Sequence, residues 1–291
     1  MASPRRRIGL IGGAALVAGV ALLGGAALGL DRLALALLRP PHRAPARTPA
    51  DVGMQAQDWT VPGDPALEGW WIEGGDPAGP VVLLAHGWGA NGAALLPLAQ
   101  AAAPVSAAVA LWDVRGHGRS DRAARVSIRQ FRDDALRAVQ AAGTRLPGRP
   151  LLLVGHSMGG AAGILAAREG APLAGLVLIA TPWDVFGAIA RYLRERGLPG
   201  GLLVPLLKPF WRVRVGVPAR TVHPGRALTG LALRTLVIQP ERDTRVPPRD
   251  GERLARAAGT EAMLVAGADH TDVLTSPQVA ELLRDFVAAT R

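Results

Sequence analysis

Short apolar runs alternate with longer amphipathic stretches over most of the chain, from residue 67 onward. The runs have the length of buried strands, and the stretches between them carry apolar residues at helical spacing. The predicted strands are Leu67–Ile72, Val81–His86, Val105–Val114, Leu151–Gly155, Leu173–Ala180, Leu233–Gln239 and Ala262–Ala266. Because strands separated by helices build a parallel sheet that is covered on both faces, the pattern predicts an α/β fold with a mostly parallel central sheet.

One of the intervening stretches has a clear start signal for a helix. Ser127 directly precedes an amphipathic segment that runs to Ala142, and a serine at this position can cap the first turn. The apolar residues of the segment recur on one face, at Ile128, Phe131, Ala135, Leu136 and Val139. We therefore expect a helix that packs on the sheet through this stripe.

The N-terminus has a different pattern, an uncharged run of 23 residues from Ile8 to Leu30 that follows Arg5–Arg7. As a helix it would be roughly 34 Å long, enough to cross a bilayer, although glycine and alanine supply over half of it. We favour an uncleaved single-pass membrane anchor over residues 1–38, with the rest of the chain outside the cytoplasm. A secreted protein, cleaved at the small residues of Ala34–Ala36, is the alternative.

Residues 39–65 are rich in proline and polar residues, which predicts a linker that leads into the first strands. Residues 66–291 then make one domain. An insertion at about 182–229 separates two predicted strands, and its aromatic and apolar residues recur at helical spacing. We expect a helical cap there, which either shapes an apolar pocket or simply packs on the domain.

Composition and charge exclude several functions. The formal net charge is +10, but the basic residues are scattered and no aromatic residues interleave with them, so nucleic-acid binding is not expected. The chain has no cysteine, which removes disulfides, thiolate metal sites and cysteine nucleophiles. None of its six histidines forms a ligand-spaced pair, so we predict neither a metal site nor a cofactor.

The most informative stretch is Leu151–Gly160, in which an apolar strand leads to Ser157 and then to an Ala-rich helical segment. This is the strand–turn–helix context in which G-x-S-x-G forms a nucleophile elbow. Gly155, Gly159 and Gly160 would remove the Cβ atoms that collide at so tight a turn. The pattern predicts that Ser157 is a nucleophile.

Two later strands end at residues that could activate this serine. Asp243 follows one strand, with Glu241 as a nearby competitor, and His270 follows the last. In parallel sheets the loops at the carboxyl ends of the strands collect the chemistry. The order Ser157, Asp243, His270 is the order of the triad in this kind of fold. We expect His117, whose loop precedes the nucleophile strand, to be structural.

An oxyanion needs backbone N–H donors, and the sequence offers two. One is Met158, directly after the nucleophile, and the other is Trp88 in the glycine-containing loop that follows an earlier strand. We name His86, Trp183 and Phe186 as candidate substrate contacts.

These pieces together resemble the α/β-hydrolase superfamily, in its serine hydrolase branch. The motifs that carry the resemblance are HGWG at 86–89, DVRGHGRS at 113–120, GHSMGG at 155–160, ERDTRVP at 241–247 and GADH at 267–270. The resemblance covers about the last 210 residues and implies the α/β-hydrolase fold with a helical cap, but the shared motifs do not identify a substrate.

The expected function is hydrolysis of carboxylic esters or related acyl compounds, in the manner of esterases and lipases. Ser157 would form an acyl-enzyme, His270 would act as the base, and Asp243 would orient the imidazole. The expected partners are a small acyl substrate, lipophilic if the cap shapes a pocket, and a membrane bound through residues 1–38. Acyl transfer by the same triad is the alternative, and a membrane-tethered protein without turnover is a third.

Overall fold

The computed structural model describes residues 4–216 and 219–290, with side chains described outside 4–18 and 219–220. Arg5–Arg7 and the start of the predicted apolar run therefore lie outside the described side chains. Eight strands form one sheet in the order β1-β2-β4-β3-β5-β6-β7-β8. Their bounds are β1 Gln57–Val61, β2 Leu67–Glu73, β3 Val81–Ala85, β4 Ala108–Trp112, β5 Leu151–His156, β6 Gly175–Ile179, β7 Thr235–Pro240 and β8 Ala262–Val265.

The sheet is mostly parallel, as the sequence predicts. From β4 to β8 all neighbouring strands run parallel, whereas β2 pairs antiparallel with both β1 and β4. The central strands β3, β4, β5 and β6 are buried at every position. Both faces of such a strand are buried, so apolar and polar residues do not alternate along it. These strands therefore appear in the sequence as continuous apolar runs.

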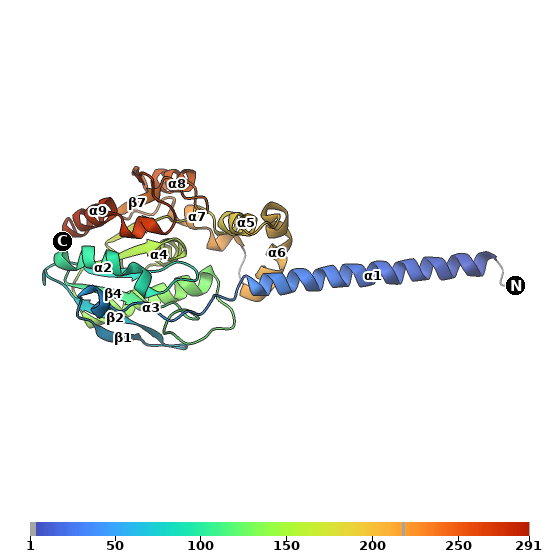
Figure 1. Cartoon of the computed structure of the whole chain (residues 1–291), viewed down its shortest axis with the longest axis horizontal. Coiled ribbons are helices and arrows are strands. Elements are labelled where there is room, and N and C mark those ends of the chain that lie inside the picture. The colour runs from blue at the N-terminus through green and yellow to red at the C-terminus, as the bar shows by residue number, and fades with distance from the viewer. Residues whose placement is uncertain (1–3, 217–218, 291) are drawn as a thin grey trace.

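Helices cover both faces of this sheet (Figure 1). Along β3, Leu83 belongs to a hydrophobic cluster that includes α3, α4, α7 and α8, and Leu84 to one that includes α2 and α9. The bounds are α2 Leu96–Ala102, α3 Ile128–Arg145, α4 Met158–Arg168, α7 Pro224–Leu228, α8 Pro248–Ala258 and α9 Pro277–Ala288. Ser127 caps α3 as predicted, accepting a hydrogen bond from the Arg129 N–H.

A helical insertion between β6 and β7 forms the cap. It contains α5 Val185–Glu195, α6 Gly200–Val215, the short 3-10 helix η4 Ala219–Val222 and α7. Asp184 caps α5 by accepting hydrogen bonds from Phe186 and Gly187 N–H groups. The remaining 3-10 helices are η1 Pro49–Val52, η2 Gly92–Leu95, η3 Ala103–Val105 and η5 Asp272–Thr275.

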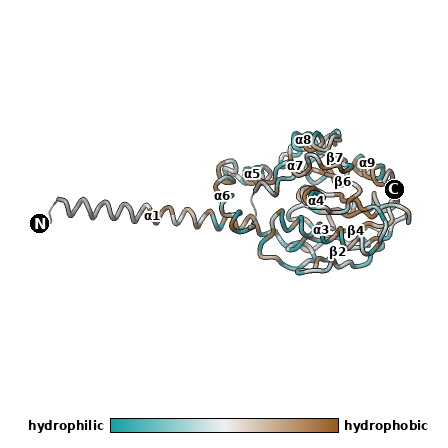
Figure 2. Tube along the Cα trace, turned by 180° about the vertical axis from the view of Figure 1, so that it is seen from behind, coloured by the Kyte–Doolittle hydropathy of each residue, from teal (hydrophilic) through white to brown (hydrophobic). Residues whose placement is uncertain are grey.

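The N-terminal helix α1, Pro4–Ala36, projects away from the domain, and the cap helices α5 and α6 lie beside its base (Figure 1). Its window Gly19–Ala36 is long and apolar enough to cross a membrane by length and composition. Figure 2 shows the hydrophobic colouring along this window, where Leu22 and Leu23 are largely exposed. The end of the helix packs on the cap: Ala34, and Leu38 just after the helix, are buried in a hydrophobic cluster with residues of α5 and α6.

The first strand of the sheet lies within residues 39–65, the region expected to lead into the first strands. Residues 57–61 form the edge strand β1, paired with β2 in register from Gln57 opposite Trp71 to Val61 opposite Leu67. Trp59 and Val61 point into the core, whereas Thr60 between them is exposed. This alternation is typical of a strand with one solvated face, and the polar residues that it requires resemble a linker in the sequence.

Candidate active site

Ser157 occupies a strained turn between β5 and α4. Its φ of 54° and ψ of −117° lie in a region that residues with a side chain rarely adopt. The turn is held by a hydrogen bond from the Ser157 N–H to the Ile179 carbonyl, at 2.9 Å. A Cβ at Gly155 would overlap the backbone of Gly160, and one at Gly159 would overlap the Ala85 carbonyl. The glycines of the motif therefore allow the close approach of strand and helix that projects the serine.

The structure brings Ser157, His270 and Asp243 into one chain of hydrogen bonds. The Ser157 Oγ lies 3.1 Å from His270 Nε2, and His270 Nδ1 lies 2.6 Å from Asp243 Oδ2. Because the carboxylate can only accept, Nδ1 carries the proton and Nε2 is free to accept from the serine hydroxyl. The three residues follow β5, β8 and β7, so they meet at the carboxyl edge of the sheet.

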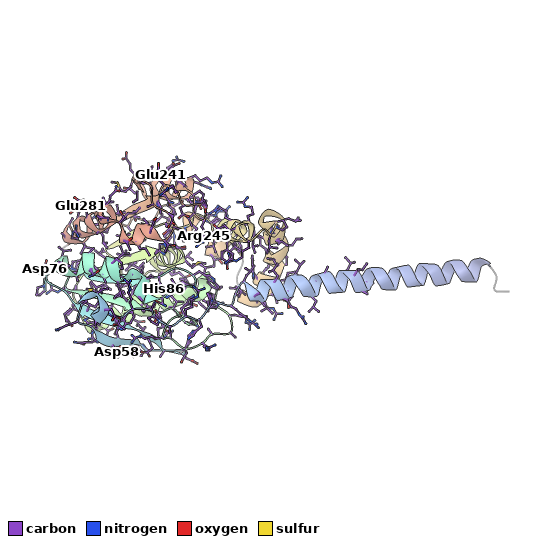
Figure 3. The ribbon with its side chains drawn as sticks, in the orientation of Figure 1. Asp58, Asp76, His86, Glu241, Arg245 and Glu281 are labelled. Carbon is purple, nitrogen blue, oxygen red and sulfur yellow. The ribbon has the colours of Figure 1, made fainter. Side chains whose placement is uncertain are left out.

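Asp243 is fixed by its own loop. Its Oδ1 accepts hydrogen bonds from the Arg245 and Val246 N–H groups, at 2.9 and 2.7 Å, and the residue is buried. The competing acid, Glu241, is elsewhere: its carboxylate accepts the Gly267 N–H and it lies at the periphery of the domain (Figure 3). Asp243, and not Glu241, is therefore the carboxylate that contacts His270, a choice that their closeness in the sequence left open.

His156, directly before the serine, contacts His270 through a hydrogen bond and through its ring. Its Nε2–H donates to the His270 carbonyl at 2.8 Å, and the two rings are 4.9 Å apart. Burial, and after it the neighbouring His270, lower the pKa of His156 to about 3. A neutral His156 adds no positive charge beside an imidazole that must itself become protonated. The sequence analysis did not single out His156; its position next to the nucleophile was the signal.

The His86 ring is enclosed in the body of the domain (Figure 3) and is bonded at both nitrogens. Its Nε2 accepts the Val114 N–H at 3.0 Å, so Nδ1 carries the proton and donates to the Gly87 carbonyl at 2.8 Å. Burial lowers the pKa of His86 to about 4, and the bond to Gly87 opposes this shift. The imidazole thus joins two loops and has no free nitrogen for a substrate.

The loop 113–120 is structural, in agreement with the expectation for His117. Asp113 accepts the Gly92 and Arg119 N–H groups at 2.6 and 2.8 Å, and Arg115 forms an ion pair with the buried Asp134. Burial, followed by the nearby His86, lowers the pKa of His117 to about 3. These bonds join the loop to η2 and to α3.

A cavity of about 230 Å³ lies beside Ser157 and His270. Trp88 and Met158, the predicted oxyanion donors, both line it, and Met158 begins α4, where a first-turn N–H has no acceptor within its helix. Phe186, one of the candidate substrate contacts, also lines the cavity. Trp183 does not; it packs on Gly225 and under the Arg253 guanidinium.

The lining includes residues that the sequence analysis missed. Among the residues whose side chains are described, four cations border the cavity: Arg39, Lys208, Arg212 and Arg245. Residues 36–39 and Pro41, at the end of the N-terminal helix and directly after it, also line the cavity. No local pattern marks residues 36–39 and Pro41 as lining residues, because α1 and the cap, which meet beside the cavity, are far apart in the sequence.

A family model described as "Serine aminopeptidase, S33" matches residues 76–196, a range that contains Ser157 but neither Asp243 nor His270. The human monoglyceride lipase is 32% identical over 145 residues, which is 48% of this chain and 48% of the relative. The rat monoglyceride lipase is 33% identical over 134 residues, 45% of this chain and 44% of the relative. The matches thus span about half the length of these curated relatives.

Among solved structures, an esterase from Pyrococcus furiosus superposes with a TM-score of 0.67 and 19% identity, covering 86% of this chain and 99% of that one. At this identity the likeness establishes the fold. The sheet order, the elbow at Ser157 and the sequence matches agree with one another: the chain has the α/β-hydrolase fold, and over the matched residues it is similar to serine hydrolases with that fold.

Proposed function

We propose that the protein is a serine esterase, lipase-like in its substrate, that acts through a triad of Ser157, His270 and Asp243. The observation that carries the proposal is the continuous hydrogen-bonded chain from the serine hydroxyl to the buried carboxylate, at 3.1 and 2.6 Å. Groups within about 2.6–3.2 Å of each other are in reach for proton transfer.

The chemistry follows from this order of groups. Ser157 Oγ attacks the ester carbonyl carbon while its proton moves to His270 Nε2, and Asp243 stabilises the resulting imidazolium. The imidazolium then gives its proton to the departing alkoxide as the ester C–O bond breaks, which leaves an acyl-enzyme. A water molecule, deprotonated by His270, then attacks the acyl carbon. The imidazolium returns that proton to Ser157 Oγ as the bond between the acyl carbon and Oγ breaks, which releases the acid and regenerates the serine.

The negative charge that develops on the carbonyl oxygen needs donors that are already in place. The backbone N–H groups of Trp88 and Met158 are our proposed oxyanion hole, since both residues border the cavity next to Ser157. Loss of one such donor typically costs about 10²–10³ in turnover. Because both are backbone groups, substitution of their side chains should leave them in place.

The cavity favours an ester with an apolar acyl chain over a substrate with a free amine. Its described lining is mostly hydrophobic, and the charged side chains along it are cations, with no aspartate or glutamate among the described lining residues. A protonated α-amine, which an aminopeptidase substrate carries, would meet only like charge there. A cavity of about 150 Å³ holds a benzene-sized molecule, so the volume here admits an acyl chain of several carbons.

We also propose that residues 1–38 anchor the protein in a membrane with the hydrolase domain outside the cytoplasm. Support comes from the apolar window Gly19–Ala36 and from its exposed leucines. N-terminal sequencing of the mature protein tests this, because a start near Leu37 would mean a cleaved signal.

Hydrolysis of p-nitrophenyl esters of rising chain length tests the activity, with Ser157→Ala as the matched control. The proposal expects turnover by the wild type and background rates for the variant. Analysis of the products in the presence of an added alcohol distinguishes hydrolysis from acyl transfer. Free acid supports hydrolysis, whereas a new ester of the added alcohol indicates acyl transfer. A folded wild type that turns over none of the esters would contradict the proposal.

A further inference from the structure

We propose that the segment Ala36–Pro41, at the end of the N-terminal helix, forms a wall of the acyl site and limits the length of chain that the enzyme accepts. The inference rests on the proposed function of Ser157. It makes the N-terminal helix part of the substrate site, in addition to any role as an anchor.

The first observation is that the segment and the reacting groups border the same cavity. Leu37 and Pro41 line it together with Ser157 and His270. The cap also lines the cavity, through Phe186 and Trp211 among others. The acyl site is thus enclosed by three parts of the chain that are far apart in sequence.

The second observation is that the end of α1 is firmly attached to α6 of the cap. The Trp211 Nε1–H donates to the Ala34 carbonyl at 3.0 Å, in a buried position. Arg214 forms a bidentate ion pair with Asp31, with its Nη2 2.7 Å from Oδ2. Ala34 is also buried in a hydrophobic cluster with residues of α5 and α6. Such directional contacts hold the helix end in one position relative to the cap.

The third observation is that the segment after the helix is attached to the hydrolase domain. The Val126 N–H donates to the Leu38 carbonyl at 2.7 Å, and Asn91 Nδ2 donates to the Arg43 carbonyl at 3.1 Å. Gly89, at φ +72°, lies so close to Pro41 that a Cβ there would be 3.0 Å from its ring. The wall therefore runs from the cap to the loop that carries Trp88, one of the proposed oxyanion donors.

Ala36 is the position where this wall can be changed with least effect on the fold. Ala36 is exposed and lines the cavity. A larger side chain there would therefore extend into the cavity rather than into the hydrophobic core. Ala27 is also exposed on α1 and is absent from the cavity lining, which makes it the matched control. A cut after Ala36, as a signal peptidase would make, would divide the wall itself.

The test compares full-length wild type with Ala36→Phe, Ala27→Phe and Leu37→Ala in one detergent. The readout is kcat/KM for p-nitrophenyl esters from acetate to laurate. We expect Ala36→Phe to lose at least about tenfold on the longest ester that the wild type accepts, with acetate within about twofold. Leu37→Ala should move the optimum to longer chains, and Ala27→Phe should match the wild type.

Labelling by a small fluorophosphonate reports whether each variant retains a folded site. A labelled Ala36→Phe with an unchanged chain-length profile would overturn the inference and leave the esterase proposal intact. If Ala36→Phe is not labelled, the test rests on Leu37→Ala. An optimal ester chain length in Leu37→Ala that equals that of the wild type then overturns the inference. A wild type that neither labels nor hydrolyses any ester would overturn the proposed function, and this inference with it.

Discussion

Protonation of the buried His86 should destabilise the fold in mild acid, and the size of the effect follows from its surroundings. In the folded protein the ring is neutral, because Nε2 accepts the Val114 N–H and burial lowers its pKa to about 4. In the unfolded chain the pKa of a histidine is about 6.5. Between these two values the unfolded state binds more protons, so stability is lost as the pH falls.

The magnitude comes from the two pKa values. Linkage between about 6.5 and about 4 gives a loss of roughly 2 kcal/mol at pH 5 relative to pH 7.5 for this residue alone. His117 and His156, whose pKa values are lowered to about 3, add losses of the same sign. Total domain stability is only about 5–15 kcal/mol, so the effect should be plain in an unfolding experiment.

The assay is urea unfolding followed by tryptophan fluorescence, from pH 7.5 to pH 5, for the wild type and His86→Gln. The glutamine retains an oxygen that can accept the Val114 N–H, but it does not titrate. Its free energy of unfolding should therefore fall by about 2 kcal/mol less than that of the wild type over this range. Equal pH dependence in the wild type and His86→Gln would refute the reasoning.

Two further predictions concern the triad and the elbow. Asp243→Asn should reduce kcat by about 10⁴ with the fold unchanged, because an amide no longer selects the Nδ1–H tautomer; Glu241→Gln is the matched control and should retain activity. A comparable loss in both variants, measured by ester turnover, would contradict the choice of Asp243. Gly159→Ala should lower the free energy of unfolding by about 1–3 kcal/mol or more, since its Cβ would overlap the Ala85 and His86 carbonyls. Gly201→Ala, which has open space around it, should be neutral or slightly stabilising, and equal effects would argue against crowding at the elbow.

Much of the fold was predictable because its signals are local. The buried strands appear as apolar runs, since a strand covered on both faces needs no polar residues. The serine turn was also predictable from a local signal. Cβ atoms at positions 155, 159 and 160 would overlap neighbouring atoms, so glycines occur at a fixed spacing around Ser157. The acid and base could be proposed because their strands end at the same edge of the sheet.

Features that depend on non-local packing were not predictable. The edge strand β1 carries polar residues on its solvated side, so its composition matched that of a linker. His86 follows a strand directly, like a substrate-contacting residue, and only the structure shows that both of its nitrogens are used by backbone groups. The contribution of Ala36–Pro41 to the cavity arises from the contact of α1 with α6, which joins residues nearly 180 positions apart.

The most direct test of the central claim is to map the site of covalent modification by a fluorophosphonate. We predict a single adduct on the peptide that contains Ser157, formed rapidly by the wild type and much more slowly by His270→Ala, because the imidazole must accept the hydroxyl proton. An adduct on a different residue, or equal labelling of Ser157→Ala, would contradict the account.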